Sequence, residues 1–257
     1  MNLAERTWTD ADDAETDLAV LPVGSTEQHG PHAPLGTDTV TATAVATAGT
    51  DRYDGTAIVA PAVPVGVAEE HAQFPGTLWA SPDTFRSYVR DIVKSLSTHG
   101  WNRIVVVNGH GGNVASLREV CGRVTREGET YAVPFTWFDA VDIEDIEALA
   151  GDRAMGHGGP VETSLVSHLR PDLVHGDRFE QARDGGADGW GEFLHGVNLS
   201  YDSAEFTASG IVGDPSSGSS AVGEQLLAAA SERLAELLET VERRDIDRPE
   251  RRHSEER

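Results

Sequence analysis

The sequence predicts an α/β protein built around a mainly parallel sheet that helices cover on both faces. Two observations lead to this fold class. Short apolar runs alternate along the chain with longer segments of helical periodicity, and the two clearest runs end directly in glycine-containing loops. Apolar runs without polar alternation are typical of parallel strands that are buried on both faces. Strands that alternate with helices are typical of sheets with a helical layer on each side.

Four segments are expected to contain strands. Leu18–Val23 is a short apolar run that stops at Gly24, and Thr56–Val67 contains a second strand followed by a proline-containing loop. Arg103–Val107 is the clearest strand, and Tyr131–Phe135 is a further candidate. In parallel sheets, ligands bind beyond the carboxyl ends of the strands. The residues that follow these strands are therefore the first place to look for a site.

Helices are expected between and after the strands. Pro82–Thr98 carries apolar residues at helical spacing, with Ser81 as its N-cap and Pro82 at the first helical position. A glycine-rich loop is expected at Gly185–Glu192. The other predicted helices are Thr39–Thr50, Val114–Arg126, Pro160–Leu169 and the amphipathic Ser219–Val241.

The length of 257 residues fits one large α/β domain, which we place at residues 1–242. Residues 243–257 are predicted to be a charged, disordered tail. There is no run of about 18 apolar residues, so no transmembrane helix and no membrane partner are expected. The acidic, polar N-terminal segment lacks the features of a secretory signal, which predicts a cytoplasmic protein.

Charge is the most unusual feature of the composition. There are 43 acidic residues against 20 basic ones, a formal net charge of −23, and Lys94 is the single lysine. A diffuse acidic surface poor in lysine predicts a halophilic host, with an acidic surface for a basic partner as the alternative. Nucleic acid is not an expected ligand. The single cysteine, Cys121, excludes an internal disulfide and a multi-cysteine metal cluster.

Potential metal ligands are dense in the segment Gly24–Asp38, GSTEQHGPHAPLGTD, directly after the first predicted strand. Glu27 and His29 are two residues apart, so in an extended segment both side chains reach one site. Carboxylate oxygen together with imidazole nitrogen suits zinc, manganese or iron(II). A surface loop with scattered polar residues is the alternative interpretation, which the density of ligand types disfavours.

A second cluster, NGHGGN at Asn108–Asn113, follows the clearest strand and projects His110 toward the same crevice. Taken alone, this motif is also compatible with a glycine-rich phosphate cradle at a helix N-terminus. His71, Gly111 and Asn113 are predicted to bind substrate, although a packing role for His71 is the close alternative.

A third cluster, GHGGPVETS, places His157 in a glycine loop and Glu162 at a helix start. Either residue alone could be structural, and Glu162 could be only a partner of the helix dipole. Their association with two other histidine–glycine clusters favours a catalytic role for both.

These motifs together resemble those of the creatininase family of amidohydrolases. The segments that carry the resemblance lie between about residues 20 and 224 and read GSTEQHGPHAPLGTD, EHAQFPGT, NGHGGN, HGGPVETS and GIVGDPSSG. The resemblance implies a three-layer α/β/α sandwich around a mainly parallel sheet, a centre of two divalent ions and a homohexamer.

The resemblance also implies roles for individual residues. Glu27, His29, Asp38 and His110 correspond to metal ligands, with Asp38 bridging the two ions. His157 corresponds to a histidine that stands beside the substrate and acts in proton transfer.

The chain departs from the creatinine-hydrolysing members at one position. These members carry a further carboxylate ligand two residues after the NGH histidine, where this chain has Gly112. This leaves the second metal short of a ligand, for which Glu162 is the best replacement, and it puts creatinine itself in doubt.

The expected function is that of a metal-dependent amidohydrolase, in which divalent ions supply hydroxide near neutral pH and a side chain shuttles the proton. The NGHGGN form resembles archaeal deformylases of flavin and deazaflavin biosynthesis and a peptidase of mycofactocin maturation. A formamide-bearing pyrimidine nucleotide is the leading specific substrate. The alternatives are a cyclic amide such as creatinine, a small peptide, or a non-catalytic protein that binds a metal or ligand on the same fold. No GxSxG pattern is present, which disfavours a covalent serine route.

Overall fold

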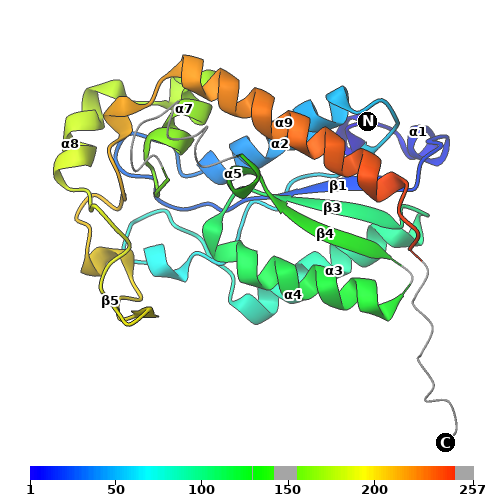
Figure 1. The fold of residues 1–257 in the computed structure, drawn as a ribbon, viewed down its shortest axis with the longest axis horizontal. Helices are drawn as coiled ribbons and strands as arrows, with labels where there is room; N and C mark the ends of the chain where they lie inside the picture. The colour runs from blue at the N-terminus through cyan, green and yellow to red at the C-terminus, as the bar shows by residue number, and fades with distance from the viewer. Residues whose placement is uncertain (129, 142–154, 247–257) are drawn as a thin grey trace, which may run out of the picture.

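A four-stranded parallel sheet forms the centre of the molecule in the computed structural model, which describes residues 1–128, 130–141 and 155–246. The strands run in the order β2-β1-β3-β4 (Figure 1). Their bounds are β1 Leu18–Val23, β2 Ile58–Val59, β3 Arg103–Asn108 and β4 Tyr131–Thr136. The predicted mainly parallel sheet is confirmed.

The register aligns the carboxyl ends of the three long strands at one edge. Val23 of β1 pairs with Asn108 of β3, and Asn108 pairs with Thr136 of β4. All residues of β1, and those of β3 from Ile104 on, are buried, and their apolar side chains alternate between two separate cores. Burial on both faces explains why these strands read as continuous apolar runs in the sequence.

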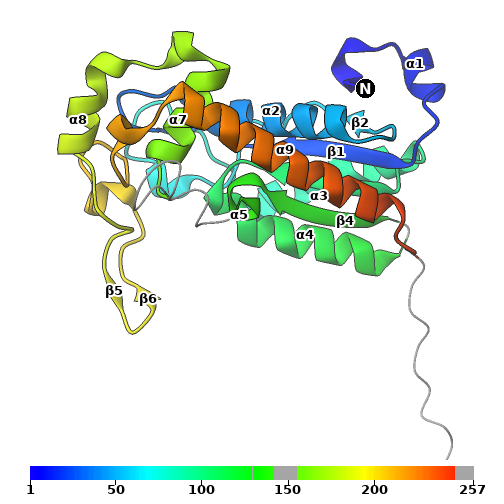
Figure 2. The ribbon, with the colours of Figure 1, turned by 45° about the horizontal axis from the view of Figure 1, so that its top comes forward.

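Helices cover both faces of the sheet, which confirms the three-layer sandwich (Figures 1 and 2). One face packs against α2 (Thr37–Arg52), α7 (Pro160–Leu169) and α9 (Ser220–Glu242). The other face packs against α3 (Pro82–Thr98) and α4 (Val114–Glu127). Helix α3 begins as the sequence predicts, because Ser81 accepts a hydrogen bond from Thr84 N and Pro82 occupies the first turn.

The remaining elements are short. A two-stranded antiparallel hairpin, β5 (Phe193–Leu194) and β6 (Val197–Asn198), projects from the body (Figure 2). The short α-helices are α1 Trp8–Asp12, α5 Trp137–Ala140 and α8 Phe179–Asp184. Single 3-10 turns occur at Leu3–Glu5, Glu69–His71, Gly111–Asn113, Pro171–Leu173, Gly176–Arg178, Ser203–Glu205 and Pro215–Ser217.

One sequence-based expectation changes. Helix α2 begins at Thr37, so Asp38 lies in its first turn rather than at the end of a loop. Within Thr56–Val67, Ile58 and Val59 form the expected strand, and Pro61 and Pro64, which cannot donate to a sheet ladder, lie in the loop after it.

Residues 243–246 of the predicted tail are described. Arg244 still contacts the sheet: its carbonyl accepts a hydrogen bond from Arg103, and its guanidinium lies over the Tyr131 ring. The rest of that tail, residues 247–257, lies outside the described part of the chain. Among the described residues, no helix combines the length and apolarity that crossing a bilayer requires.

Candidate metal centre

The side chains singled out from the sequence meet at the carboxyl ends of β1 and β3. Glu27 and His29 come from the segment after β1, Asp38 from the first turn of α2, and His110 from the segment after β3. The approach of β3 to α2 is close enough to require glycine at position 109, since a Cβ there would lie 2.3 Å from the carbonyl oxygen of Asp38. This contact explains the glycine that precedes His110.

Asp38 stands between two histidines. Its Oδ1 lies 3.0 Å from His29 Nε2, and its Oδ2 lies 3.4 Å from His110 Nδ1. His110 Nδ1 is also 3.1 Å from Glu27 Oε1. One carboxylate oxygen of Asp38 therefore faces each histidine, which is the arrangement that a carboxylate bridging two ions requires.

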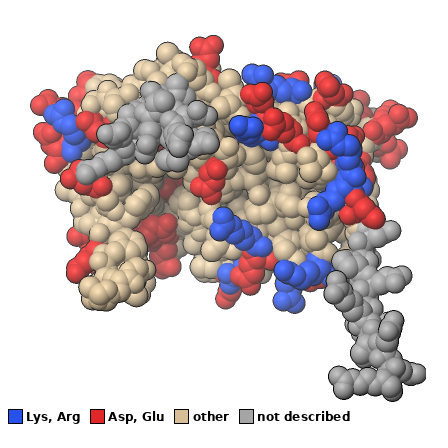
Figure 3. Space-filling model, in the orientation of Figure 1, with Lys and Arg blue, Asp and Glu red and all other residues tan. Residues whose placement is uncertain are grey.

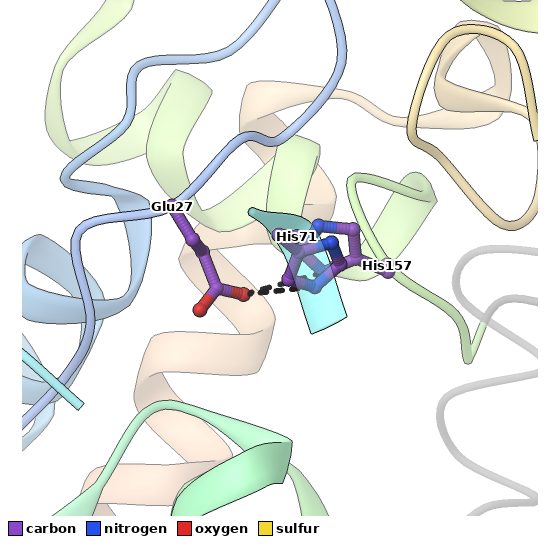
Figure 4. Close-up of side chains that lie close together, drawn as sticks. All are labelled: Glu27, His71 and His157. Carbon is purple, nitrogen blue, oxygen red and sulfur yellow. Dashed lines mark ion pairs between the residues drawn. The ribbon is translucent and has the colours of Figure 1, made fainter. Parts of the chain in front are cut away.

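Two more histidines complete the centre on the side of the cavity. His71 Nε2 lies 3.5 Å and His157 Nδ1 lies 3.7 Å from the same oxygen, Glu27 Oε1. Their rings are stacked, with centroids 4.3 Å apart and planes 18° apart, and Figure 4 shows both beside the carboxylate. Glu162 approaches His29, with its Oε2 3.7 Å from His29 Nε2.

Backbone carbonyls hold three of these histidines in place. His29 Nδ1 lies 3.2 Å from the Glu27 carbonyl, and His110 Nε2 lies 2.7 Å from the Val67 carbonyl. His157 Nε2 lies 2.6 Å from the Gln28 carbonyl. A carbonyl oxygen only accepts, so the nitrogen beside it carries the proton and, in the neutral ring, the nitrogen that faces the centre is bare. The same arrangement orients histidine ligands in metal sites.

Several polar atoms of the centre are buried without a hydrogen-bond partner among the described residues. They are both carboxylate oxygens of Glu27, Nε2 of His29 and Oδ2 of Asp38. Such atoms are costly unless a ligand satisfies them. Three sets of side chains bring their ligand atoms close enough to hold an ion: Glu27 with Asp38 and His110, Glu27 with His71 and His157, and His29 with His157 and Glu162. The donor set therefore fits divalent transition metals.

The electrostatics of the centre favour a cation. Burial opposes protonation of His110, but the charges of Glu27 and Asp38 raise its pKa to about 10. Burial likewise opposes protonation of His29, yet Asp38 and Glu162 raise its pKa well above the usual value. Burial, then the charge of Glu27, raises the pKa of Asp38 to about 7. Without a metal, protons on these histidines balance the carboxylates, and a divalent cation would displace them.

The two stacked histidines behave differently. Burial and the charge of His29 lower the pKa of His157 to about 4, and burial with the charge of His157 lowers that of His71 to about 3. For Glu162, burial opposes ionisation, but His29 lowers the carboxyl pKa below its usual value. Near neutral pH the two stacked imidazoles, His71 and His157, are therefore uncharged, while the carboxyl group of Glu162 is ionised.

A cavity of about 210 Å³ opens onto the centre. His71, His110, His157 and Glu162 line it, together with Gly111, which the sequence predicts to bind substrate. An apolar wall of the cavity is formed by Phe138, Met155, Val161 and Trp190. Trp190 precedes the projecting hairpin and lies with its ring 6.4 Å from that of His157.

Asn113, also predicted to bind substrate, has a different role. Its side chain is fully buried, accepts from Val67 N at 2.9 Å and donates to the Gly24 carbonyl at 3.0 Å. It therefore ties the segments after β1, β2 and β3 together and does not line the cavity. Hydrogen bonds to distant backbone atoms cannot be read from a sequence, which is why the motif suggested a ligand-binding amide.

Gly112 and Glu162 lie on different sides of the centre. A Cβ at position 112 would lie 2.2 Å from the Val67 carbonyl and 2.8 Å from Glu70 Oε1, so no side chain fits there. Glu70 lines the cavity 3.8 Å from His110 Nε2 and is the carboxylate nearest to Gly112. The sequence analysis missed Glu70, although it directly precedes His71 in the EEHAQFPGT segment.

Comparisons with known proteins place the chain among characterised sequences and structures. A family model described as creatinine amidohydrolase matches residues 4–238. A mycofactocin precursor peptide peptidase of Mycolicibacterium smegmatis is 35% identical over 216 residues, 82% of this chain and 80% of that protein. A creatinine amidohydrolase of Pseudomonas putida is 33% identical over 177 residues, 63% of this chain and 67% of that protein.

Solved structures show the same architecture. A crystal structure of creatinine amidohydrolase superposes with a TM-score of 0.81 at 28% identity, covering 95% of this chain and 98% of that one. A manganese form of creatininase gives a TM-score of 0.80 at 28% identity over 95% of this chain and 99% of that one. A variant creatininase of Zn–Zn type gives 0.79 at 27% identity over 95% and 98%.

Proposed function

The chain belongs to the creatininase family, and from this premise we propose that it hydrolyses the C–N bond of a small amide at the centre around Glu27, Asp38 and His110. The family makes it a metal-dependent hydrolase of carbon–nitrogen bonds. Its cofactor is a divalent metal, in keeping with the manganese and Zn–Zn forms of its structural neighbours. The buried, unpartnered oxygens and nitrogen of the centre are the observation that carries the proposal.

Two ions are assigned to two groups of side chains. Glu27, Asp38 and His110 would hold one ion. His29 would hold the other with Asp38 and Glu162, whose oxygens lie 3.0 Å and 3.7 Å from His29 Nε2. Divalent ions at such sites make water acidic and polarise a carbonyl group. Glu162 is kept in place for this role because its Oε2 accepts a hydrogen bond from Gly158 N at 2.6 Å.

His157 is assigned to proton transfer. Its Nε2 donates to the Gln28 carbonyl, which leaves Nδ1 bare, facing the centre and the cavity. A bare, uncharged imidazole nitrogen can take a proton from the attacking water and deliver it to the leaving nitrogen. The apolar wall of the cavity favours exclusion of water around a bound substrate.

The lining of the cavity limits the substrate. Among the described lining residues there is no lysine or arginine, whereas Glu70 and Glu162 contribute carboxylates. A phosphate group would find no cation here except the metals. The sequence predicts a formamide-bearing pyrimidine nucleotide as substrate. The cavity suits a formamide whose part inside the cavity carries no phosphate better than it suits the nucleotide.

A second candidate is an amide bond in a short peptide. The similarity to mycofactocin precursor peptide peptidases extends over 82% of this chain, farther than the similarity to the Pseudomonas putida creatinine amidohydrolase. An apolar side chain of a peptide would suit the wall formed by Phe138, Met155, Val161 and Trp190.

One substrate panel tests these candidates. The zinc- and manganese-loaded protein is incubated in molar salt with a formamidopyrimidine, creatinine and a set of short peptides, and formate, creatine and new amino groups are measured. We expect turnover in one class only, abolished by EDTA and by Asp38→Asn, which keeps the volume of the side chain. EDTA-resistant turnover, or equal turnover in Asp38→Asn, would refute the assignment of the centre.

The family resemblance also predicts a homohexamer, which a single chain does not test. Light scattering at several salt concentrations measures the mass directly. A monomer at all concentrations would contradict that prediction without affecting the assignment of the metal centre.

A further inference from the structure

We infer that His71 is locked, by Gln28, as the tautomer with its proton on Nε2, and that it donates this N–H to the substrate amide. The inference rests on the proposed function for the identity of the acceptor, but its first part concerns the protein alone. It assigns opposite roles to the two stacked rings, His71 as a donor and His157 as an acceptor.

The orientation of the Gln28 amide is determined by two backbone groups. Its Oε1 accepts a hydrogen bond from Gly30 N at 2.9 Å, and its Nε2 donates to the Gly210 carbonyl at 2.7 Å. A backbone N–H can only donate and a carbonyl can only accept. The NH2 end of the Gln28 side chain is thereby identified, and one of its two hydrogens remains available.

That second hydrogen points to His71. Gln28 Nε2 lies 3.0 Å from His71 Nδ1, and both side chains are buried. Because the amide nitrogen donates, His71 Nδ1 must accept and carries no proton. The hydroxyl of Ser203, 2.9 Å from the same nitrogen, can turn its hydrogen toward it as well. The proton of the neutral ring is therefore on Nε2.

This arrangement is the reverse of that in the other histidines of the centre. His29, His110 and His157 each have a backbone carbonyl behind the ring and a bare nitrogen in front. His71 has donors behind the ring and an N–H in front, 3.5 Å from Glu27 Oε1 and at the cavity wall. A bare nitrogen suits a metal ion or a proton, whereas an N–H suits an oxygen atom.

The acceptor that best suits this N–H is the oxygen of the amide under attack. As the carbonyl carbon becomes tetrahedral, negative charge develops on that oxygen, and a fixed donor stabilises it more than it stabilises the substrate. A neutral ring in this tautomer offers its N–H to that oxygen without adding charge. Removal of one such donor typically costs 10²–10³-fold in kcat.

The first experiment reads the tautomer without any substrate. The zinc-loaded protein, labelled with ¹⁵N at histidine, is examined by long-range ¹H–¹⁵N correlation spectroscopy, with His71→Gln used to assign the resonance. We expect His71 to show a protonated Nε2, and the other three histidines of the centre to show a bare nitrogen on the metal side. A bare Nε2 in His71 overturns the inference whether or not a substrate is known.

Gln28→Glu tests the cause of the tautomer. A carboxylate at this place attracts the proton to Nδ1 and leaves Nε2 bare, so the His71 signal should change to the opposite tautomer. Ser203→Ala is the matched control, because it removes the other neighbour of Nδ1 but leaves the amide, and the signal should not change tautomer. If Gln28→Glu fails to fold, Gln28→Ala removes the donor instead, and a mixture of both tautomers is expected.

Kinetics and metal analysis test the donor role. His71→Ala should lower kcat by about 10²–10³-fold, with little change in KM, and His71→Gln should recover part of this loss because its amide can donate. Metal content should stay at the wild-type value in both variants. Loss of metal in both would show that His71 is a ligand, and equal kcat in His71→Ala and wild type would exclude a donor role. If the panel detects no turnover even in the wild type, the proposed function fails, while the spectroscopic result still stands.

Discussion

The metal centre and the projecting arm, Phe193–Tyr201, depart from the usual distribution of side chains in opposite ways. The centre buries carboxylates and imidazoles that ordinarily lie at the surface, and the arm exposes apolar side chains that ordinarily lie inside. The departure at the centre is costly unless a ligand satisfies the buried polar atoms, whereas apolar side chains on a protein surface are common. The two regions also differ in how firmly the fold holds them.

The centre is held from many directions. Each of its histidines is positioned by a hydrogen bond at its far nitrogen, which donates in His29, His110 and His157 and accepts in His71, and Asp38 is held in the first turn of a helix. Buried polar atoms that lack partners and yet are rigidly placed are typical of a site organised for a ligand. Here the ligand is a divalent cation.

The arm is held only locally. It contains no charged residue, although the chain has a net charge of −23, and Tyr201 is 81% exposed. A tight turn at His195 and Gly196, both with positive φ, joins its two short strands. Figure 3 shows it as an uncharged lobe on a surface where acidic side chains are otherwise scattered. A two-stranded hairpin without packing is only marginally stable in water.

The largest effect is expected from Asp38, because it faces both histidine groups. Asp38→Ala should abolish stoichiometric metal binding and, with it, turnover that depends on the metal. It should also remove the stabilisation by metal, about 3–4 kcal/mol when the free ion exceeds its Kd by 100- to 1,000-fold. Metal content by mass spectrometry and melting curves with and without EDTA measure both. Full metal occupancy in this variant would contradict the bridging role.

His157 is next. His157→Ala should lower kcat by about 10²–10⁴-fold with metal content intact, which is the usual weight of general acid–base catalysis. Replacement of His99, a surface histidine outside the centre, serves as the control and should change neither quantity. Joint loss of metal and activity would make His157 a ligand, and loss of stability alone would make it structural.

Metal affinity should depend on pH. The raised pKa values of His29 and His110 mean that protons compete with the ion, so affinity should fall as pH falls, by about tenfold per unit for each proton displaced. In the metal-free chain, folding stability depends on pH in the opposite direction. Because the pKa of His110 is higher in the folded than in the unfolded chain, its protonation stabilises the fold fully at pH values below the unfolded pKa. This contribution is lost as pH rises through about 10. Zinc competition titrations at pH 6 and pH 8 check the first statement, and a pH-independent affinity would oppose it.

Salt should have a smaller effect that is spread over the whole surface. With a net charge of −23, self-repulsion should destabilise the fold at low ionic strength. The melting temperature should rise by about 5 °C or more between roughly 0.1 M and 3 M salt. An unchanged melting curve would contradict the expectation of a halophilic host.

The smallest effect on stability is expected in the arm. Leu194 and Val197 are already more than half exposed, so Leu194→Ser or Val197→Ser should change the free energy of unfolding by no more than about 0.5 kcal/mol. Leu165→Ser, in the core of α7, is the contrasting control and should cost several times as much. A large destabilisation by the arm variants would show that the arm is packed, which would remove the contrast with the centre.

Local patterns in the sequence were sufficient for most of the fold. The bounds of Leu18–Val23, Pro82–Thr98 and Pro160–Leu169 agree with the structure, because continuous burial, an N-cap or a proline at the first turn acts over a few residues. The density of ligand types after the strands likewise indicated Glu27 and His110. The arm was missed, since its short strands follow a glycine-rich loop and have no alternating pattern to reveal them.

The tertiary structure alone decided what each residue of the site can do. The sequence determined that carboxylates and histidines follow the strands of a parallel sheet, and this implied a metal centre. It could not show that Asn113 ties loops together, that Glu70 stands beside Gly112, or that Gln28 faces His71. Those roles depend on partners 40 or more residues away, and proton positions follow from the partner behind each ring rather than from the identity of the residue.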